Sequence, residues 1–314
     1  MTRLLRGVLV LFGISVLVFL IFFATPGADP AARLAGRGAS AEALAMVRQE
    51  YGLDRPLPVQ YARLMARLAT GELTSQVNRG QRVVPALLRA APVTLSLVAG
   101  AAVLWLAAGL GIGLVAAARE GSAWDRGATA LGLLGVSIPV FWLGEVVNLI
   151  TQDRLHDSWF AWVPPLGYAP LSNGVGAWAR ALALPWATLA LLYAGVYGRV
   201  LRTSLIEAYR QDYIRTARAK GIGEARVLLR HALRNALVAV VALFGLDVGA
   251  LVGGGTLLTE VVFGLHGVGK LTYDALQTLD LPMVMAAVMY AAAFVVLANA
   301  GVDALQAVLD PRRR

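Results

Sequence analysis

The stretch AAPVTLSLVAGAAVLWLAAGLGIGLVAAA, residues 90–118, carries no charged side chain and is bounded by Arg89 and Arg119. A helix rises about 1.5 Å per residue, so about 20 mainly apolar residues cross the hydrocarbon core of a bilayer. This stretch is long enough, and similar stretches occur at residues 7–24, 127–150, 181–200, 236–258 and 282–304. The sequence therefore predicts an all-α integral membrane protein with six spans and no soluble catalytic domain.

The composition agrees with this prediction and excludes several kinds of site. Apolar residues make up 58% of the 314 residues and charged residues 15%, and the mean hydropathy is +0.66. There is no cysteine, which excludes disulfides and thiolate chemistry. His156, His231 and His266 lie far apart, so we expect no metal site and no catalytic residue. The net charge of +9 comes without interleaved aromatic residues, and nucleic acid is not an expected partner.

The residues of the spans predict that the first span is not cleaved off and that the helices pack tightly. The first span ends at Pro26-Gly27, and Ala24-Thr25-Pro26 is a poor signal-peptide cleavage site, so this span is predicted to stay as an anchor. Pro139 and Pro185 interrupt the third and fourth spans, where neighbouring helices can satisfy the freed carbonyl groups. Glycine and alanine are frequent in all spans and allow close helix packing.

Basic residues in the short loops predict the orientation of the chain. The segment 199–234 contains nine Lys and Arg residues against three acids, and Arg119 and Arg126 flank the loop after the second span. Such residues are typical of the cytoplasmic side. The loops 151–180 and 259–281 carry no such excess. We therefore expect both termini, including the basic tail, to be cytoplasmic.

The segment 26–89 is then external, although it contains nine arginines and five acids. Long segments cross membranes largely regardless of their charge. Ser40 is a candidate N-cap for one short amphipathic helix, and Pro58 a candidate start for a second that stops at Gly71. The apolar faces of these two helices would consist of Leu44, Val47, Tyr51, Tyr61, Leu64, Met65 and Leu68. The sequence predicts a small external helical cap.

The cytoplasmic segment 201–234 reads DYIRTARAKGI at residues 212–222 and RVLLRHALRN at residues 226–235. Helix-forming residues on both sides of Gly221 predict a helix-turn-helix that is too charged to enter the bilayer. One interpretation is an anchor for anionic lipid headgroups. The other is a docking element for a cytoplasmic protein, with apolar contacts from Ile222, Val227 and Leu228 and charged contacts from Arg215, Arg218, Lys220 and Arg226.

These residues resemble the permeases of the dipeptide, oligopeptide and nickel group of ATP-binding-cassette (ABC) importers. Gly221 stands at the glycine of that family's cytoplasmic coupling loop, and RTARAKG at 215–221 is similar to the sequence often found there. Further similar segments are YGLD at 51–54, PLPVQY at 56–61, TEVVFG at 259–264, GVG at 267–269, DLP at 280–282 and LDPR at 309–312. The resemblance covers nearly the whole chain and involves several motifs in the same order.

The resemblance implies a six-helix type I ABC importer permease in the bacterial cytoplasmic (inner) membrane, with a small external helical segment after the first span. Its parts would be the N-terminal span 1–25, the external segment 26–89, the five-helix core 90–308 and the tail 309–314. The coupling residues would be Arg215, Thr216, Ala217, Arg218, Ala219, Lys220, Gly221 and Ile222.

The implied partners are cytoplasmic ATPase subunits, a second homologous permease subunit, an extracytoplasmic substrate-binding protein and the lipid bilayer. ATP and Mg²⁺ would be bound by the ATPase subunits and no cofactor by this chain. Small peptides are the expected substrate, with nickel or another small solute as the alternative.

The segment GLHGVGK at residues 264–270 has the spacing of a phosphate-binding loop. Leu271 occupies the position where Ser or Thr must hold Mg²⁺, and the segment follows a membrane span instead of a strand. We therefore expect no nucleotide site here, and the chain is not expected to be an enzyme.

Glu145 and Asp247 fall inside predicted spans and are candidates for a polar translocation pathway, where either could bind a cationic group. They could instead be protonated or paired with a polar neighbour such as Asn148. A proton-coupled secondary transporter is another interpretation, but it requires two matched halves, and none are visible. A membrane-embedded enzyme would need acid-base pairs that the spans lack.

Overall fold

The computed structural model describes residues 2–24, 29–35, 38–78 and 80–309. The predicted end of the first span at Pro26-Gly27 and the tail residues 310–314 lie outside this part of the chain. Helices dominate the described residues, and an isolated antiparallel bridge joins Thr74 to Arg82.

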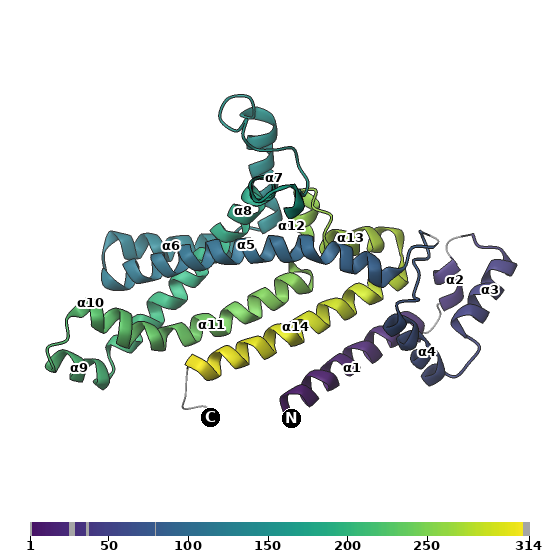
Figure 1. Cartoon of the computed structure of the whole chain (residues 1–314), viewed down its shortest axis with the longest axis horizontal. Coiled ribbons are helices and arrows are strands. Elements are labelled where there is room, and N and C mark those ends of the chain that lie inside the picture. The colour runs from purple at the N-terminus through teal and green to yellow at the C-terminus, as the bar shows by residue number, and fades with distance from the viewer. Residues whose placement is uncertain (1, 25–28, 36–37, 79, 310–314) are drawn as a thin grey trace. The chain divides into compact units, whose positions relative to one another are not determined.

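The helices follow one another along the chain as labelled in Figure 1. In the N-terminal part they are α1 (Thr2–Phe23), α2 (Pro30–Ala35), α3 (Ala41–Tyr51), α4 (Leu57–Thr70) and α5 (Val83–Ala118). The middle part contains α6 (Ala123–Ser137), α7 (Val140–Asn148) with a π-helical extension (Leu149–Arg154), a 3-10 turn (Leu171–Asn173) and α8 (Val175–Tyr209). Next come α9 (Asp212–Ala219), α10 (Glu224–Arg226), the π-helical Val227–Ala232, α11 (Leu233–Ala250) and the π-helical Leu251–Gly255. The last helices are α12 (Leu257–Val262), α13 (Val268–Thr278) and α14 (Leu281–Leu309).

The chain forms two compact units, which are described separately. Unit 1 comprises residues 1–94, 252–261 and 266–296, and unit 2 comprises residues 95–251, 262–265 and 297–314. The division falls within α5 and α14, so each of these helices contributes to both units.

Within the described ranges, five helices are long and apolar enough to cross a membrane: Leu5–Phe23, Val83–Ala118, Val175–Tyr209, Glu224–Gly255 and Leu281–Val302. The pair Ala123–Gly135 and Val140–Asp153 also passes this test but is bent by 95°, and it makes a sixth span if counted as one. The third span predicted at 127–150 is thus present as two helices with a sharp bend between them. Pro139 lacks an amide hydrogen and disfavours helical geometry in the residue before it, so α6 ends at Ser137 and α7 starts anew at Val140.

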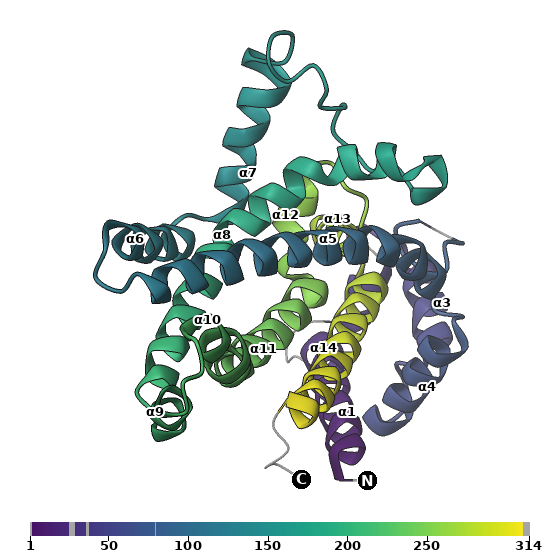
Figure 2. The same cartoon turned by 60° about the vertical axis from the view of Figure 1, so that its left-hand side comes forward.

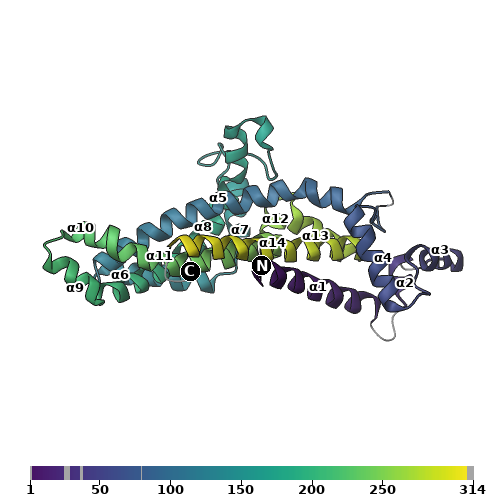
Figure 3. The same cartoon turned by 60° about the horizontal axis from the view of Figure 1, so that its bottom comes forward.

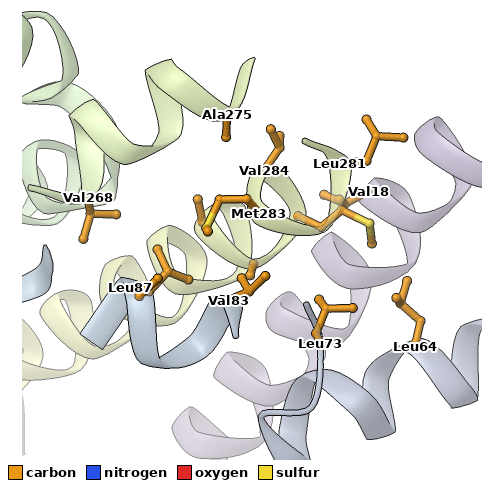
Figure 4. Packing of buried hydrophobic residues seen from close by; sticks show 14 of the residues in the cluster. Val18, Leu64, Leu73, Val83, Leu87, Val268, Ala275, Leu281, Met283 and Val284 are labelled. Atoms are coloured by element: carbon orange, nitrogen blue, oxygen red, sulfur yellow. The ribbon is translucent and has the colours of Figure 1, made fainter. Parts of the chain in front are cut away.

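The core of unit 1 joins the first and last parts of the sequence. Figure 4 shows Val18 of α1, Leu64 of α4 and Val83 of α5 beside Leu281 and Met283 of α14. The Ser75 hydroxyl donates to the Asp280 carboxylate, which also accepts from the backbone amide of Met283 in the first turn of α14. One acid thereby caps a helix and ties it to a segment about 200 positions earlier.

The segment 26–89 contains the two predicted amphipathic helices. The Ser40 hydroxyl accepts from the Ala43 amide at 3.2 Å as the N-cap of α3, and α4 has proline in its first turn and ends at Gly71 in the left-handed conformation. Val47, Tyr51, Tyr61, Leu64, Met65 and Leu68 all belong to or pack against the core of unit 1. The N-cap Ser40, the stop at Gly71 and these six apolar positions are confirmed, whereas Leu44 is half-buried and is not among the residues packed against this core.

In unit 2, α6 and α8 pack closely through glycine (Figure 2). A Cβ atom at Gly195 of α8 would lie 2.6 Å from the carbonyl oxygen of Leu131 and 2.9 Å from the Cα of Gly132. Only glycine allows the two backbones to approach this closely. Pro185 lies inside α8, and this helix of 35 residues is not interrupted there.

Candidate functional site

The predicted helix-turn-helix around Gly221 is present in unit 2. The helices α9 and α10 lie side by side beyond the end of α8 and the start of α11 (Figure 3). Arg210 and Gln211 alone separate α8 from α9, and the π-helical segment 227–232 joins α10 to α11 without a break. The turn is therefore attached directly to two of the long apolar helices.

The turn ends α9 by a defined hydrogen-bond pattern. Gly221 has a φ of 73°, which favours glycine, and its amide donates to Arg218 O at 2.9 Å. The Ile222 amide donates to Ala217 O at 3.2 Å, which completes a Schellman motif. Space around the Gly221 Cα is open, so the backbone conformation is the reason for glycine here.

Two buried residues attach α9 to the unit. Ile214 is fully buried and Ala217 is 5% exposed, and their spacing of three positions puts both on one face of the helix. Arg215, Thr216, Arg218, Ala219, Lys220 and Gly221 are exposed, and Ile222 is half-buried. The anchored helix thus presents a basic outer face.

The structure corrects part of the predicted docking surface. Val227 is fully buried and supports the turn from inside, while Leu228 is half-buried. The exposed apolar side chains that sequence reasoning missed are Tyr213, at 39% exposure, and Leu229, at 57%. Helical periodicity could have predicted this exposure, because Tyr213 and Leu229 do not share the helix faces on which Ile214 and Val227 are buried.

Arg218 has partners within the turn. Its Nε and Nη2 donate to the Glu224 carboxylate at 2.7 and 3.0 Å, and its guanidinium lies over the Tyr209 ring. This arrangement closes the turn between α9 and α10. Arg215 makes a longer contact of 3.2 Å with Asp212 in the same helix, and its side chain is 74% exposed.

The two acids predicted for the pathway lie in different settings. Glu145 is exposed on α7, and Asp247 of α11 is half-buried and accepts from the Tyr197 hydroxyl at 2.8 Å. No hydrogen bond or ion pair between described residues joins the two acids. Asn148, a suggested neighbour of Glu145, donates instead to Val262 O at 2.9 Å. An ionised side chain in a span costs about 2.5–3.5 kcal/mol on insertion scales, so the setting of Asp247 requires an explanation.

The glycines at 267 and 269, which belong to the predicted phosphate-loop spacing and lie in unit 1, have a structural cause. The fully buried Glu260 accepts from Thr94 Oγ1 at 2.7 Å, Thr256 Oγ1 at 2.9 Å and the Lys270 amide at 2.9 Å. The Val268 amide donates to Thr94 Oγ1 at 2.9 Å. The N-terminus of α13, which could attract a phosphate, is therefore occupied by a side-chain carboxylate.

The glycines of this segment make room for that contact. A Cβ atom at Gly267 would lie 2.5 Å from Glu260 Oε2, and one at Gly269 would lie 2.6 Å from the Cα of Leu257. Burial raises the pKa of Glu260, while the hydrogen bonds to its carboxylate act in the opposite direction. Lys270 Nζ pairs with Asp274 at 3.0 Å. Among the described residues, no group of three or more His, Cys, Asp or Glu side chains is arranged to hold a metal ion.

Comparison with known sequences identifies the class to which this arrangement belongs. The family described as the inner membrane component of binding-protein-dependent transport systems matches residues 109–314, and the N-terminal region of such membrane components matches residues 1–98. The chain belongs to this family. It is an all-α permease of the type I ABC importer class, and ATP hydrolysis is the work of separate subunits.

Individual relatives are similar over their full length. A putative peptide transport system permease protein of Brucella abortus (strain 2308) is 37% identical, with 99% of this chain and 97% of the relative covered. A dipeptide transport system permease protein of Alkalihalophilus pseudofirmus is 32% identical, with 99% and 98% covered. A di/tripeptide transport system permease protein of Pseudomonas aeruginosa is 35% identical, with 96% and 94% covered.

Proposed function

We propose that this chain forms, with a second homologous permease subunit, the pathway by which small peptides enter the cell. The names of the relatives from Brucella abortus, Alkalihalophilus pseudofirmus and Pseudomonas aeruginosa support peptides as the substrate. Peptides would be delivered by an extracytoplasmic binding protein. The polar groups along the pathway would include Asp247 and Glu145.

We further propose that the turn from Arg215 to Ile222 docks into the ATPase subunits. The observation that carries this proposal is the attachment of α9: Ile214 and Ala217 are buried, while the basic face is exposed. Because α9 follows α8 after two residues and α10 runs into α11, a movement of the docked turn would move both long helices. Such a movement would open the pathway alternately to each side of the membrane.

The same proposal sets the orientation of the chain. The docking turn and both termini would face the cytoplasm, where the ATPase subunits bind ATP and Mg²⁺. The segment 26–89, which contains α2, α3 and α4, would face the outside. The excess of basic residues in segment 199–234 supports this orientation.

Substitution of the glycine in the turn tests the coupling. Gly221→Val forces a β-branched residue into the left-handed region at a cost of roughly 1–2 kcal/mol, so we expect peptide-stimulated ATP hydrolysis by the reconstituted complex to fall about tenfold. Gly223→Val is the matched control, because Gly223 has a φ of −62° and equally open space around it. Full assembly and stimulation in the Gly221→Val complex would refute the coupling role.

A further inference from the structure

Asp247 lies beside a cluster of aromatic rings in unit 2. The Tyr197 hydroxyl donates to Asp247 Oδ2 at 2.8 Å. The Trp105 ring stacks on Tyr193 with centroids 4.8 Å apart and lies 6.0 Å from the centroids of both Tyr197 and Phe244. The helices α5, α8 and α11 therefore contribute to one acidic, aromatic site.

Burial within the cluster is graded. Trp105 and Tyr197 are fully buried and form its base. Tyr193, Phe244 and Asp247 are half-buried, so each of these residues keeps part of its surface exposed. A ligand could thus reach the site without displacing the residues of the base.

Among the residues that the structure describes, the carboxylate has one hydrogen-bond partner, and that partner is neutral. No Lys, Arg or His forms an ion pair with Asp247 in the described part of the chain, and the hydrogen bond from Tyr197 engages Oδ2 alone. An ionised carboxylate in an apolar span requires a compensating charge. Since no cationic side chain of the described residues pairs with Asp247, a ligand could supply that charge.

We propose that Asp247 and its aromatic neighbours bind the positively charged amino group at the N-terminus of the transported peptide, an inference that rests on the proposed function. A carboxylate supplies a charge-assisted hydrogen bond to an ammonium group, and aromatic faces attract cations. The amino terminus of a peptide carries this charge near neutral pH. A divalent metal ion fits less well, because the cluster offers one carboxylate and no imidazole or thiolate ligand.

The test compares peptides that differ only in this charge. The complete complex, with its binding protein, is reconstituted in vesicles, and a dipeptide competes with its N-acetylated form for uptake. Asp247→Asn keeps the shape and an acceptor for the Tyr197 hydroxyl but removes the charge. We expect the preference for the free amino group to fall about tenfold in this variant. Because the binding protein is the same in all experiments, the change would arise in the permease.

Two further variants separate recognition from stability. Asp247→Glu retains the charge and should restore most of the preference, which a purely structural role would not predict. Tyr193→Leu removes an accessible ring and should lower the preference by a smaller factor, even if Asp247→Asn does not assemble. An unchanged preference in Asp247→Asn, or in Tyr193→Leu if the first variant fails to assemble, overturns the inference. If the wild-type complex takes up no peptide, the proposed function fails instead.

Discussion

At the scale of single residues, Glu260 explains a motif that otherwise suggests nucleotide binding. Its carboxylate occupies the N-terminus of α13, and Gly267 and Gly269 are small because the carboxylate and α12 lie against them. A spacing of glycines followed by lysine is thus a packing feature here. The neighbouring side chains distinguish a packing feature from a nucleotide site. Thr94 accepts from the Val268 amide, so a side chain takes up a backbone donor at the start of α13 that a phosphate would otherwise bind.

We predict that Glu260→Gln destabilises unit 1 by about 1–3 kcal/mol, since an amide nitrogen cannot accept a hydrogen bond in either carboxylate position. Depending on the side it occupies, the Lys270 amide or the hydroxyls of Thr94 and Thr256 lose their acceptor. Thermal unfolding of the purified protein in detergent measures this loss. Lys270→Gln is the control, because it removes the side-chain pair with Asp274 and keeps the backbone amide. Equal melting temperatures for wild type and Glu260→Gln would contradict the buried role of this acid.

At the scale of helices, glycine determines how closely neighbours approach and proline determines where a span breaks. The carbonyl oxygen of Leu131 lies 2.6 Å from where a Cβ atom of Gly195 would stand, so α6 and α8 are held together by backbone contacts. Pro139 ends this close packing and separates α6 from α7, whereas Pro185 is accommodated inside α8. The same residue type therefore has different effects in two helices of unit 2.

We predict that Gly195→Ala lowers the stability of unit 2 by about 1–3 kcal/mol, because the added methyl group meets backbone atoms that side-chain rotation cannot move away. The melting temperature of the detergent-solubilised protein measures the effect. Gly127→Ala in α6 provides the comparison, since apart from its chain neighbours and the nearby backbone of its own helix nothing lies within 4 Å of its added Cβ. That variant should be neutral or slightly stabilised, as alanine favours helices over glycine. Identical behaviour of the two variants would exclude close packing at Gly195.

At the scale of the whole chain, the proposed orientation follows from charge and can be measured directly. The chain has no cysteine, so each introduced thiol reports on a single position. Met46 in α3 is 64% exposed, and the side chain of Arg215 in α9 is 74% exposed. Both positions are therefore accessible to a reagent on the correct side of the membrane.

We predict that a membrane-impermeant maleimide labels Met46→Cys in intact cells and labels Arg215→Cys only after the membrane is opened. The cysteine-free parent gives the background signal. Labelling of Arg215→Cys from outside intact cells would place the docking turn away from the ATPase subunits, and the proposed coupling would then be untenable.

The sequence alone determined the membrane class, the approximate spans, the caps of α3 and α4 and the turn at Gly221. These features depend on local properties, namely the length of apolar runs, helix periodicity and the conformational freedom of glycine. Family motifs spread along the chain added the permease class.

Only the tertiary structure decided which side chains meet. It placed Thr94 and Glu260 at the start of α13, joined Tyr197 to Asp247 and left Glu145 exposed on α7. It also broke the third span at Pro139 and buried Val227 beneath the turn. Such contacts join residues far apart in the chain, and their geometry depends on how whole helices pack, which no local pattern records.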